Sequence, residues 1–398
     1  MERIRADEPL WKRGKIVGSV FQDPKSQFFS SEMAGEVAFS CENYGLSHKE
    51  ITVRTDAAIR RFQLEELRDS SLDVLSSGEK QRTAMASVYA MDPPVYVCDE
   101  PTANLDEQGV KELREVLQSL KREGKTLLIA EHRLCWLMEL ADRFVYIEDG
   151  RLRWERTQGE MKALTSVQLE QFGLRTVRNL SPVKLVPPVG EGIPSVLLRG
   201  LSCRRGGRVI WENLNLRAYP GQIVAVTGQN GAGKTTLARL IAGLERRCEG
   251  EFCLCGRKAS RRQRRRKCWY SSNDTGTQFF TDSVTEELLL GLQRTETVLM
   301  KARELLKRLE LYDYKDAHPA VLSGGQRQRL SIACGLLSDR EILLFDEPTS
   351  GLDGGNMHRI AEVLMQAASE GKTILIITHD EELMQLCCEF RWQLGSVS

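Results

Sequence analysis

Residues 228–235 read GQNGAGKT and match the pattern G-x-x-x-x-G-K-[ST]. They follow the apolar run IVAVT at 223–227 and precede the helix-like stretch TLARLIAGL at 236–244. A strand before and a helix after are the context in which this pattern forms a phosphate-binding loop. Its glycines let backbone N–H groups close around a β-phosphate, and the start of the next helix favours an anion. The stretch therefore predicts a nucleotide-binding α/β fold.

Within this loop, Lys234 is expected to bridge the β- and γ-phosphates, and Thr235 to hold Mg²⁺. The backbone of the whole loop is expected to surround the phosphates of a nucleotide. The nucleotide-binding candidates here are Gly228, Gln229, Asn230, Gly231, Ala232, Gly233, Lys234, Thr235 and Thr236.

Two carboxylates follow the apolar run ILLF at 342–345. A strand end of this kind is where α/β sheets bind ligands. Asp346 suits the Mg²⁺ shell, and Glu347 suits a general base that polarises the attacking water. His379 ends the next apolar run and is a candidate catalytic contact to the γ-phosphate.

The chain contains an internal repeat, in which three landmarks of the first copy return at an offset of 247 residues. A further pair upstream aligns at an offset of 251. The paired strings are LSSGEKQR (75–82) and LSGGQRQR (322–329), VYVCDEPTANLD (95–106) and ILLFDEPTSGLD (342–353), KTLLIAEH (125–132) and KTILIITH (372–379), and FQDPKSQFF (21–29) and SNDTGTQFF (272–280).

The offset places the phosphate loop of the first copy ahead of residue 1, so we expect that copy to lack this loop and about 57 residues of its start. The predicted organisation is a truncated first domain at 1–150, a linker at 151–194 and a complete second domain at 195–398. Apolar runs read as buried parallel strands, and helical patterns between Phe29 and Leu75 and between Phe280 and Leu322 predict a helical subdomain in each copy. Strands such as VYVCDE and TLLIAEH are expected to expose apolar faces in the first copy.

The phosphate loop, LSGGQ, DEPTSGLD and the strand-end histidine together resemble the ATP-binding-cassette (ABC) ATPases over nearly the whole chain. The resemblance implies two cassettes that sandwich ATP, with the phosphate loop of one cassette facing the LSGGQ helix of the other. LSGGQ resembles a helix start that offers N–H groups and a serine hydroxyl to a γ-phosphate. One implied site joins Lys234, Thr235, Asn273, Asp346, Glu347 and His379 with Ser76, Ser77, Gly78 and Glu79 of the first copy.

The other implied site has no phosphate loop in this sequence. Either a separate polypeptide supplies that loop, or the gene or its start is truncated, or the site is inactive. Where the family has a glutamine that contacts Mg²⁺, the first copy has Gln22 and the second has the shorter Asn273. The remnants of this second site are Gln22, Asp99, Glu100, His132, Ser323, Gly324, Gly325 and Gln326.

The string QDPKSQFF at 22–29 resembles a segment of the energy-coupling-factor importers, which take up vitamins and cobalt or nickel. That resemblance implies an ATPase that uses ATP and Mg²⁺ and docks on a transmembrane T component, which carries a substrate-binding S component. The alternative reading of QFF is a packed loop at a helix start. The substrate is not encoded in this chain, because specificity would belong to another subunit.

The rival class is a soluble tandem cassette that acts on ribosomes or nucleic acid. GRKASRRQRRRK at 256–267 has eight basic residues in twelve, but we expect a solvated, charged edge there. The link from Gly150 to Pro194 also lacks the long charged hairpin of ribosome-acting cassettes. We therefore expect no nucleic-acid partner.

Composition predicts a protein that stays in the cytosol, and the resemblance to the importers implies a peripheral position on the cytoplasmic face of the membrane. The 398 residues include 56 basic and 55 acidic side chains, so no chain-wide field attracts nucleic acid. No run approaches the roughly 18 apolar residues of a membrane span. The eleven cysteines are too sparse for a disulfide scaffold, and reduced thiols are expected.

Overall fold

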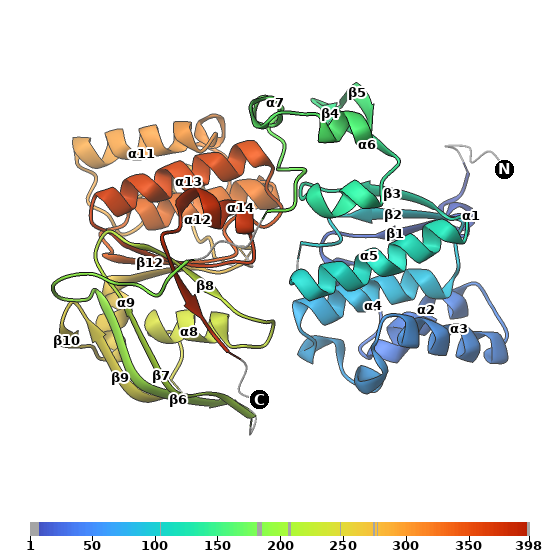
Figure 1. Cartoon of the computed structure of the whole chain (residues 1–398), viewed down its shortest axis with the longest axis horizontal. Coiled ribbons are helices and arrows are strands. Elements are labelled where there is room, and N and C mark those ends of the chain that lie inside the picture. Colours follow the sequence, from blue (N-terminus) through green and yellow to red (C-terminus); the bar gives the residue numbers. More distant parts are fainter. Residues whose placement is uncertain are drawn as a thin grey trace. The chain divides into compact units, whose positions relative to one another are not determined.

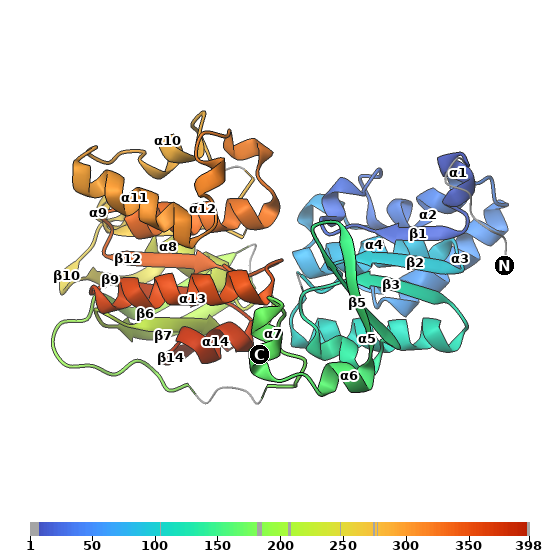
Figure 2. The same cartoon turned by 90° about the horizontal axis from the view of Figure 1, so that it is seen from above.

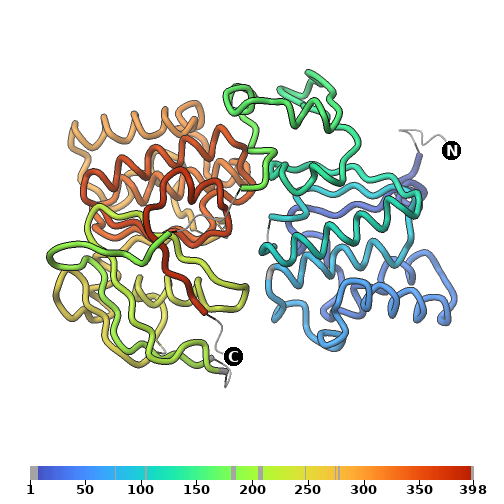
Figure 3. Tube along the Cα trace, viewed as in Figure 1, coloured from blue at the N-terminus to red at the C-terminus, as the bar shows by residue number. Residues whose placement is uncertain are grey.

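The computed structural model describes residues 8–103, 105–180, 185–205, 208–246, 248–273, 275–276 and 278–395, without the side chains of Ser77, Arg205 and Arg208. The chain forms two compact units. Unit 1 contains the chain up to Gln168 together with Arg175–Asn179, and unit 2 contains Leu169–Leu174 and the chain from Leu180 onward. The first part of the predicted linker, residues 151–168, belongs to unit 1, and the Cα trace in Figure 3 shows its course.

Unit 1 is built on a parallel sheet of three strands in the order β1-β2-β3, side by side in Figure 2. The strands are β1 (Val17–Val20), β2 (Val95–Asp99) and β3 (Thr126–Ala130). Val95 of β2 pairs with Val17 of β1 and with Thr126 of β3. The apolar runs VYVCD and TLLIA are thus the parallel strands that the sequence predicts.

The helices of unit 1 include the predicted helical insertion. Figure 1 shows α4 and α5 along one face of the three-stranded sheet. The helices are α1 (Leu10–Arg13), α2 (Met33–Asn43), α3 (His48–Arg61), α4 (Ser77–Ala90), α5 (Glu107–Arg122) and α6 (Gln158–Lys162), followed by α7 (Ser166–Gln171) at the boundary between the units.

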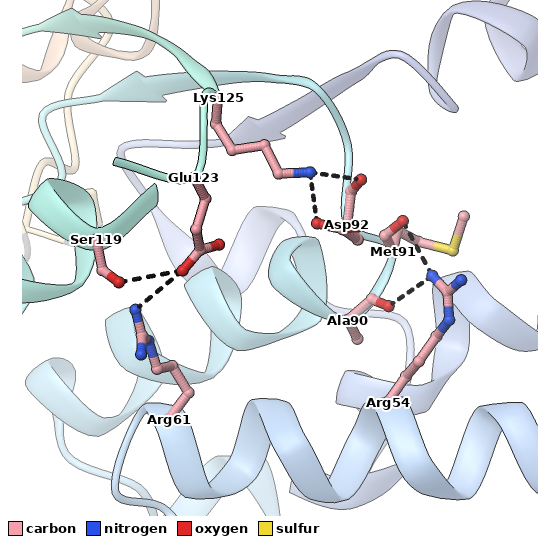
Figure 4. Close-up of polar contacts among 8 residues, drawn as sticks. All are labelled: Arg54, Arg61, Ala90, Met91, Asp92, Ser119, Glu123 and Lys125. Atoms are coloured by element: carbon pink, nitrogen blue, oxygen red, sulfur yellow. Dashed lines mark hydrogen bonds and ion pairs between the residues drawn. The ribbon is translucent and has the colours of Figure 1, made fainter. Parts of the chain in front are cut away.

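Cationic side chains of unit 1 form hydrogen bonds and ion pairs near the end of α4 (Figure 4). Arg54 of α3 donates to the carbonyls of Ala90 and Met91 at 3.4 and 3.3 Å, at the end of α4. Lys125, just before β3, pairs with Asp92 at 2.5 Å. These contacts satisfy carbonyls that the end of α4 leaves without intrahelical donors.

A two-stranded antiparallel hairpin follows in unit 1. It consists of β4 (Arg143–Glu148) and β5 (Arg151–Thr157), which pair with each other. Tyr146 stacks on Trp154 across the hairpin, with ring centroids 5.0 Å apart. Val145 and Ile147 remain exposed on β4.

Unit 2 is built on a parallel sheet of five strands in the order β11-β12-β13-β8-β14. Ile223 and Ala225 of β8 belong to one apolar core, and Val224 and Val226 belong to another, because successive side chains of a strand point to opposite faces. The strands are β8 (Ile223–Thr227), β11 (Cys268–Ser271), β12 (Ile342–Asp346), β13 (Thr373–Ile377) and β14 (Phe390–Gln393).

A second, antiparallel sheet covers one face of unit 2, with α8 between the two sheets in Figure 1. Its strands, in the order β10-β9-β6-β7, are β6 (Val196–Arg205), β7 (Arg208–Ala218), β9 (Glu249–Leu254) and β10 (Arg257–Lys258). The helices of unit 2 are α8 (Lys234–Ile241), α9 (Arg261–Lys267), α10 (Val284–Leu288), α11 (Glu296–Arg308), α12 (Gly324–Leu337), α13 (Gly354–Ser369) and α14 (Glu381–Cys387).

The matched strands β3 and β13 differ in burial. All five residues of β13 are buried, because β12 pairs along one edge and β8 along the other. Among the described residues of unit 1, β3 pairs only with β2, and Leu128 at its centre is 62% exposed. The matched residue of β13, Leu375, is 2% exposed. An apolar strand face is thus open in unit 1, as the sequence predicts.

Candidate nucleotide-binding site

The glycine-rich loop connects β8 to α8 in a conformation that only glycines adopt easily. Gly228, Gly231 and Gly233 have φ angles of 149°, 83° and 86°. A Cβ atom on Gly233 would lie 2.5 Å from the ring of Trp211, whose indole N–H donates to the carbonyl of Ala232 at 2.8 Å. The loop is therefore held in shape by β7 before any ligand binds.

Lys234 directs its ammonium group back into this loop. Its Nζ lies 2.7 Å from the carbonyl oxygen of Gly228 and 3.1 Å from that of Gln229, and the side chain is buried. Gln229 and Asn230 are exposed at the tip, and Thr236 is half-buried in the first turn of α8. The loop thus places a cation and the start of a helix at one point, as a polyphosphate requires.

Asp346 ends β12 and receives two hydroxyl hydrogen bonds on one oxygen. Thr235 Oγ1 donates to its Oδ2 at 2.8 Å and the Tyr270 hydroxyl donates to the same atom at 3.2 Å. Burial raises the pKa of the Asp346 carboxyl, and the two hydrogen bonds oppose that shift. A carboxylate and a threonine hydroxyl at a phosphate loop are hard oxygen donors that fit Mg²⁺, which takes its other ligands from water and phosphate.

Glu347 follows in a strained backbone conformation, with a φ angle of 50°. Its N–H donates to the carbonyl of Ile377 at 2.9 Å, and Thr378 Oγ1 donates to its carboxylate at 3.2 Å. His379 comes directly after this threonine, at the end of β13. Asn273 lies two residues beyond β11 and is exposed. The carboxyl ends of β8, β12 and β13 thus bring Lys234, Glu347 and the histidine segment to one edge of the sheet.

The two LSxG strings form helix starts of the same design. Ser323 caps α12: its hydroxyl accepts from the N–H of Gln326 at 3.3 Å, and the Gln326 side chain accepts from the N–H of Ser323 at 2.8 Å. Ser76 and Glu79 make the same capping box at the start of α4, at 3.4 and 2.7 Å.

Small residues continue both helix starts. Gly325 packs so closely on Leu352 that a Cβ atom would lie 2.7 Å from a leucine methyl group. Gly324 has open space at the same point, and Gly78 is the half-buried counterpart of Gly325 in unit 1. The side chain of Ser77 lies outside the described residues.

Unit 1 has a similar group of polar side chains at the carboxyl ends of its parallel strands. Gln22 Nε2 donates to Glu100 at 3.0 Å, and His132 Nε2 lies 3.6 Å from the same carboxyl. Burial raises the pKa of Glu100, and the nearby His132 opposes that shift. Asp99 ends β2 and is exposed. Glu100 has a φ angle of 43°, which repeats the strain at Glu347.

Comparison with known proteins identifies this architecture. The family model for "ABC transporter" matches residues 2–103 and 211–350, which is more than half of the chain. The chain belongs to the ABC transporter family. Each unit is therefore an ABC cassette, and the α/β fold with two cassettes that the sequence predicts is confirmed.

Several curated relatives resemble the chain over most of its length. A Treponema denticola protein, provisionally named an ABC transporter ATP-binding protein, is 38% identical over 94% of this chain and 77% of its own. A Methanosarcina mazei protein with the same provisional name is 34% identical over 95% and 73%. The Bacillus subtilis protein YkoD, provisionally named an HMP/thiamine import ATP-binding protein, is 30% identical over 92% and 72%.

Solved structures share the fold of the tandem cassettes. A model of ribosome-bound archaeal Pelota and ABCE1 matches 95% of this chain and 62% of the solved chain with a TM-score of 0.71 at 24% identity. The archaeal ribosome recycling factor aABCE1, in complex with the stalk protein aP1, matches 96% and 72% with a TM-score of 0.65 at 23% identity. In the described part of this ABC protein, no helix combines the length and apolar character needed to cross a bilayer.

The arginine-rich run of the second cassette is largely exposed, as the sequence predicts, but it also makes contacts that the sequence does not indicate. It forms α9, and three of its guanidinium groups turn toward the carboxyl end of α8. Arg264 donates to the carbonyl of Leu240 at 2.6 Å, and Arg261 and Arg265 donate to that of Gly243 at 2.8 and 3.0 Å. The cations thus complement the negative end of the helix that carries the phosphate loop. Arg262 and Arg266 are exposed, and Arg265 is exposed as well despite its hydrogen bond.

One further pair of residues with matching roles in the two cassettes is not indicated by the motifs. Glu36 and Glu287 are buried carboxylates that each accept two successive backbone N–H groups, at 2.8 to 3.0 Å, just after the QFF strings. Phe29 and Phe280, whose N–H groups they hold, are 75% and 81% exposed. The second phenylalanine of QFF is therefore largely exposed in both cassettes, although the Phe29 ring stacks on that of Phe39 with centroids 4.9 Å apart. The repeat of a glutamate seven residues after each phenylalanine was the available signal.

Substitution of Arg264 by leucine should destabilise the second cassette by about 2 to 3 kcal/mol. The change leaves the buried Leu240 carbonyl without its charged donor and removes a guanidinium that lies 3.8 Å from the Phe252 ring centroid. Hydrogen exchange of the α8 amides should accelerate accordingly. The matched control is Arg262→Leu, an exposed neighbour in the same helix, whose effect should stay within about 0.5 kcal/mol. Equal effects of the two variants would contradict the capping role.

Proposed function

We propose that the chain hydrolyses ATP to power an importer of the energy-coupling-factor type, which takes up a vitamin, a vitamin precursor or a metal ion. The observation that carries the ATPase part is the arrangement of the buried Lys234, the Thr235–Asp346 pair and the strained Glu347 at one sheet edge. The import part rests on QDPKSQFF and on the name of the similar protein YkoD.

In the proposed reaction a water molecule attacks the γ-phosphorus of ATP, an O–P bond forms, and the bond from that phosphorus to the β,γ-bridging oxygen breaks to release ADP. Lys234 and the loop N–H groups hold the phosphates. Thr235 and Asp346 would hold Mg²⁺, which supplies charge neutralisation of the phosphates. Glu347 accepts the proton of the attacking water, and the hydroxyl of Thr378 fixes its carboxylate.

The helix start at Ser76, with Ser77, Gly78 and Glu79, is proposed to offer N–H groups to the γ-phosphate of a nucleotide held by the phosphate loop. His379 and Asn273 are proposed to contact the γ-phosphate and Mg²⁺. The groups around Glu100 in unit 1, and the helix start at Ser323, are proposed as parts of a second nucleotide site. The fitting partners are a transmembrane T component and a substrate-binding S component, with the chain bound peripherally at the cytoplasmic face of the membrane.

The second candidate function is action on ribosomes or nucleic acid. It is favoured by the shared fold with aABCE1, a ribosome recycling factor. The arginine-rich run gives it limited support, because three of its guanidinium groups are engaged by carbonyls at the end of α8, whereas Arg262, Arg265 and Arg266 are exposed.

Binding experiments separate these functions. The importer subunit should sediment with membranes that contain its hydrophobic partners, and the double variant Arg262→Gln, Arg266→Gln should sediment equally well. Affinity for a 30-nucleotide RNA at physiological salt should be weak and non-specific, with a Kd above about 1 μM. Tight RNA binding that falls steeply with salt and is abolished in the double variant would favour the ribosome function instead.

A further inference from the structure

Tyr270 reaches the proposed metal site from a neighbouring strand. It lies on β11 and pairs in register with Leu344 of β12, two residues before Asp346. Its hydroxyl nevertheless extends to Asp346 Oδ2, where it donates at 3.2 Å. A phenol with an ordinary pKa near 10 is protonated at neutral pH and can only donate to a carboxylate. The contact therefore fixes one oxygen of Asp346.

The same oxygen also accepts from Thr235 at 2.8 Å. Thr235 is the proposed Mg²⁺ ligand, so its hydroxyl has two competing tasks when metal and nucleotide are present. Tyr270 has no such competing task at the phosphates, since it comes from the far side of β12. It is thus the donor that can continue to hold Asp346 when Thr235 turns to the metal.

A cation supports this arrangement from α8. The Arg239 guanidinium interacts with the hydroxyl of Tyr270 and also acts on the charge of Asp346. Arg239 lies five residues after Lys234 in the helix that follows the phosphate loop. The sequence of guanidinium, phenol and carboxylate thus links α8, β11 and β12 at one point.

The first cassette does not repeat this arrangement. The residue of β1 in the matched register is Ser19, which pairs with Val97 as Tyr270 pairs with Leu344. A serine side chain is too short to reach from its own strand to the end of the neighbouring strand. Of the two cassettes, the one in which a phosphate loop is described also has the tyrosine at this position.

We propose that Tyr270 is a positioning residue that orients the Asp346 carboxylate for Mg²⁺ in the second cassette. This inference rests on the proposed ATPase function. Residues that hydrogen-bond to a metal ligand from behind typically change metal affinity by about 10- to 100-fold when they are removed. The role predicts a smaller gain in nucleotide affinity when Mg²⁺ is added, which is called metal coupling below. Nucleotide affinity without metal should not change.

The test compares nucleotide affinity with and without metal in full-length Tyr270→Phe, using trinitrophenyl-ATP as the fluorescent probe. In the wild type, Mg²⁺ should tighten binding relative to EDTA. In the variant that gain should shrink about tenfold, while affinity in EDTA stays unchanged. Electron paramagnetic resonance with Mn²⁺ and saturating ADP should show the same weakening of metal binding without any turnover.

The matched control is Tyr314→Phe, which removes the same hydroxyl from an exposed tyrosine and should change neither affinity. Arg239→Gln keeps the Tyr270 hydroxyl and should cause a smaller loss of metal coupling, which covers the case of a poorly folded Tyr270→Phe. Unchanged metal coupling in both variants would overturn the role, and so would an equal loss in Mg²⁺ and EDTA. A wild-type chain that binds no nucleotide at all would count against the proposed function and not against the positioning role.

Discussion

Replacement of Glu347 by glutamine should slow ATP hydrolysis by about 10²- to 10⁴-fold and leave ATP bound. The amide keeps the shape of the side chain and its contact with Thr378, which donates to the carboxylate at 3.2 Å. It cannot accept a proton from the attacking water, so the chemical step loses its general base. ATP turnover of the purified chain and retention of radiolabelled ATP measure the two effects.

Glu100→Gln is the matched control, because Glu100 has the same strained backbone in unit 1, with a φ angle of 43° against 50° at Glu347. Only unit 2 shows a phosphate loop within the part of the chain that the structure describes. We therefore expect Glu100→Gln to change turnover less than about threefold, well below the loss of a general base. A loss as large as that of Glu347→Gln would show that both glutamates serve as bases and would refute the assignment of hydrolysis to one site.

The sequence predicts the fold well where a motif constrains the backbone. A glycine-rich loop between a strand and a helix has few possible conformations, so GQNGAGKT correctly placed β8, the loop and α8. The strand-end position of DEP likewise predicted Asp346 and Glu347 at one sheet edge. The internal repeat then extended these placements to β2, β3 and α4 in unit 1.

Contacts between distant segments were beyond reach of the sequence. Tyr270 lies 76 residues from Asp346, and nothing in CWYSS indicates which strand it will face. The arginine run gave a similar difficulty, because a row of cations looks solvated until the end of α8 supplies carbonyls for it. The strained φ at Glu347 also depends on tertiary contacts, since its N–H is held by Ile377 of the neighbouring strand.

Leu375→Ala should destabilise unit 2 by about 2 to 5 kcal/mol, whereas the matched change Leu128→Ala should cost unit 1 less than about 1 kcal/mol. Leu375 is 2% exposed at the centre of β13, between β12 and β8, so its removal leaves a cavity. Leu128 occupies the same place in β3 but is 62% exposed, so its removal leaves no cavity. Thermal unfolding of the full chain, with hydrogen exchange to assign each transition, measures both effects.

The same contrast predicts unequal stability of the two units. Burial of an apolar side chain contributes about 1.5 to 3 kcal/mol, and unit 1 forgoes this contribution at Leu128 and at the exposed Val145 and Ile147. Each 1.4 kcal/mol of local stability changes the equilibrium constant for local opening about tenfold. The amide hydrogens of β3 should therefore exchange at least about 10²-fold faster than those of β13. Trypsin should cut unit 1 first, and ATP with Mg²⁺ should protect unit 2 further. If Leu128→Ala cost as much as Leu375→Ala, and β3 exchanged as slowly as β13, the open strand face would be covered in solution by another polypeptide segment.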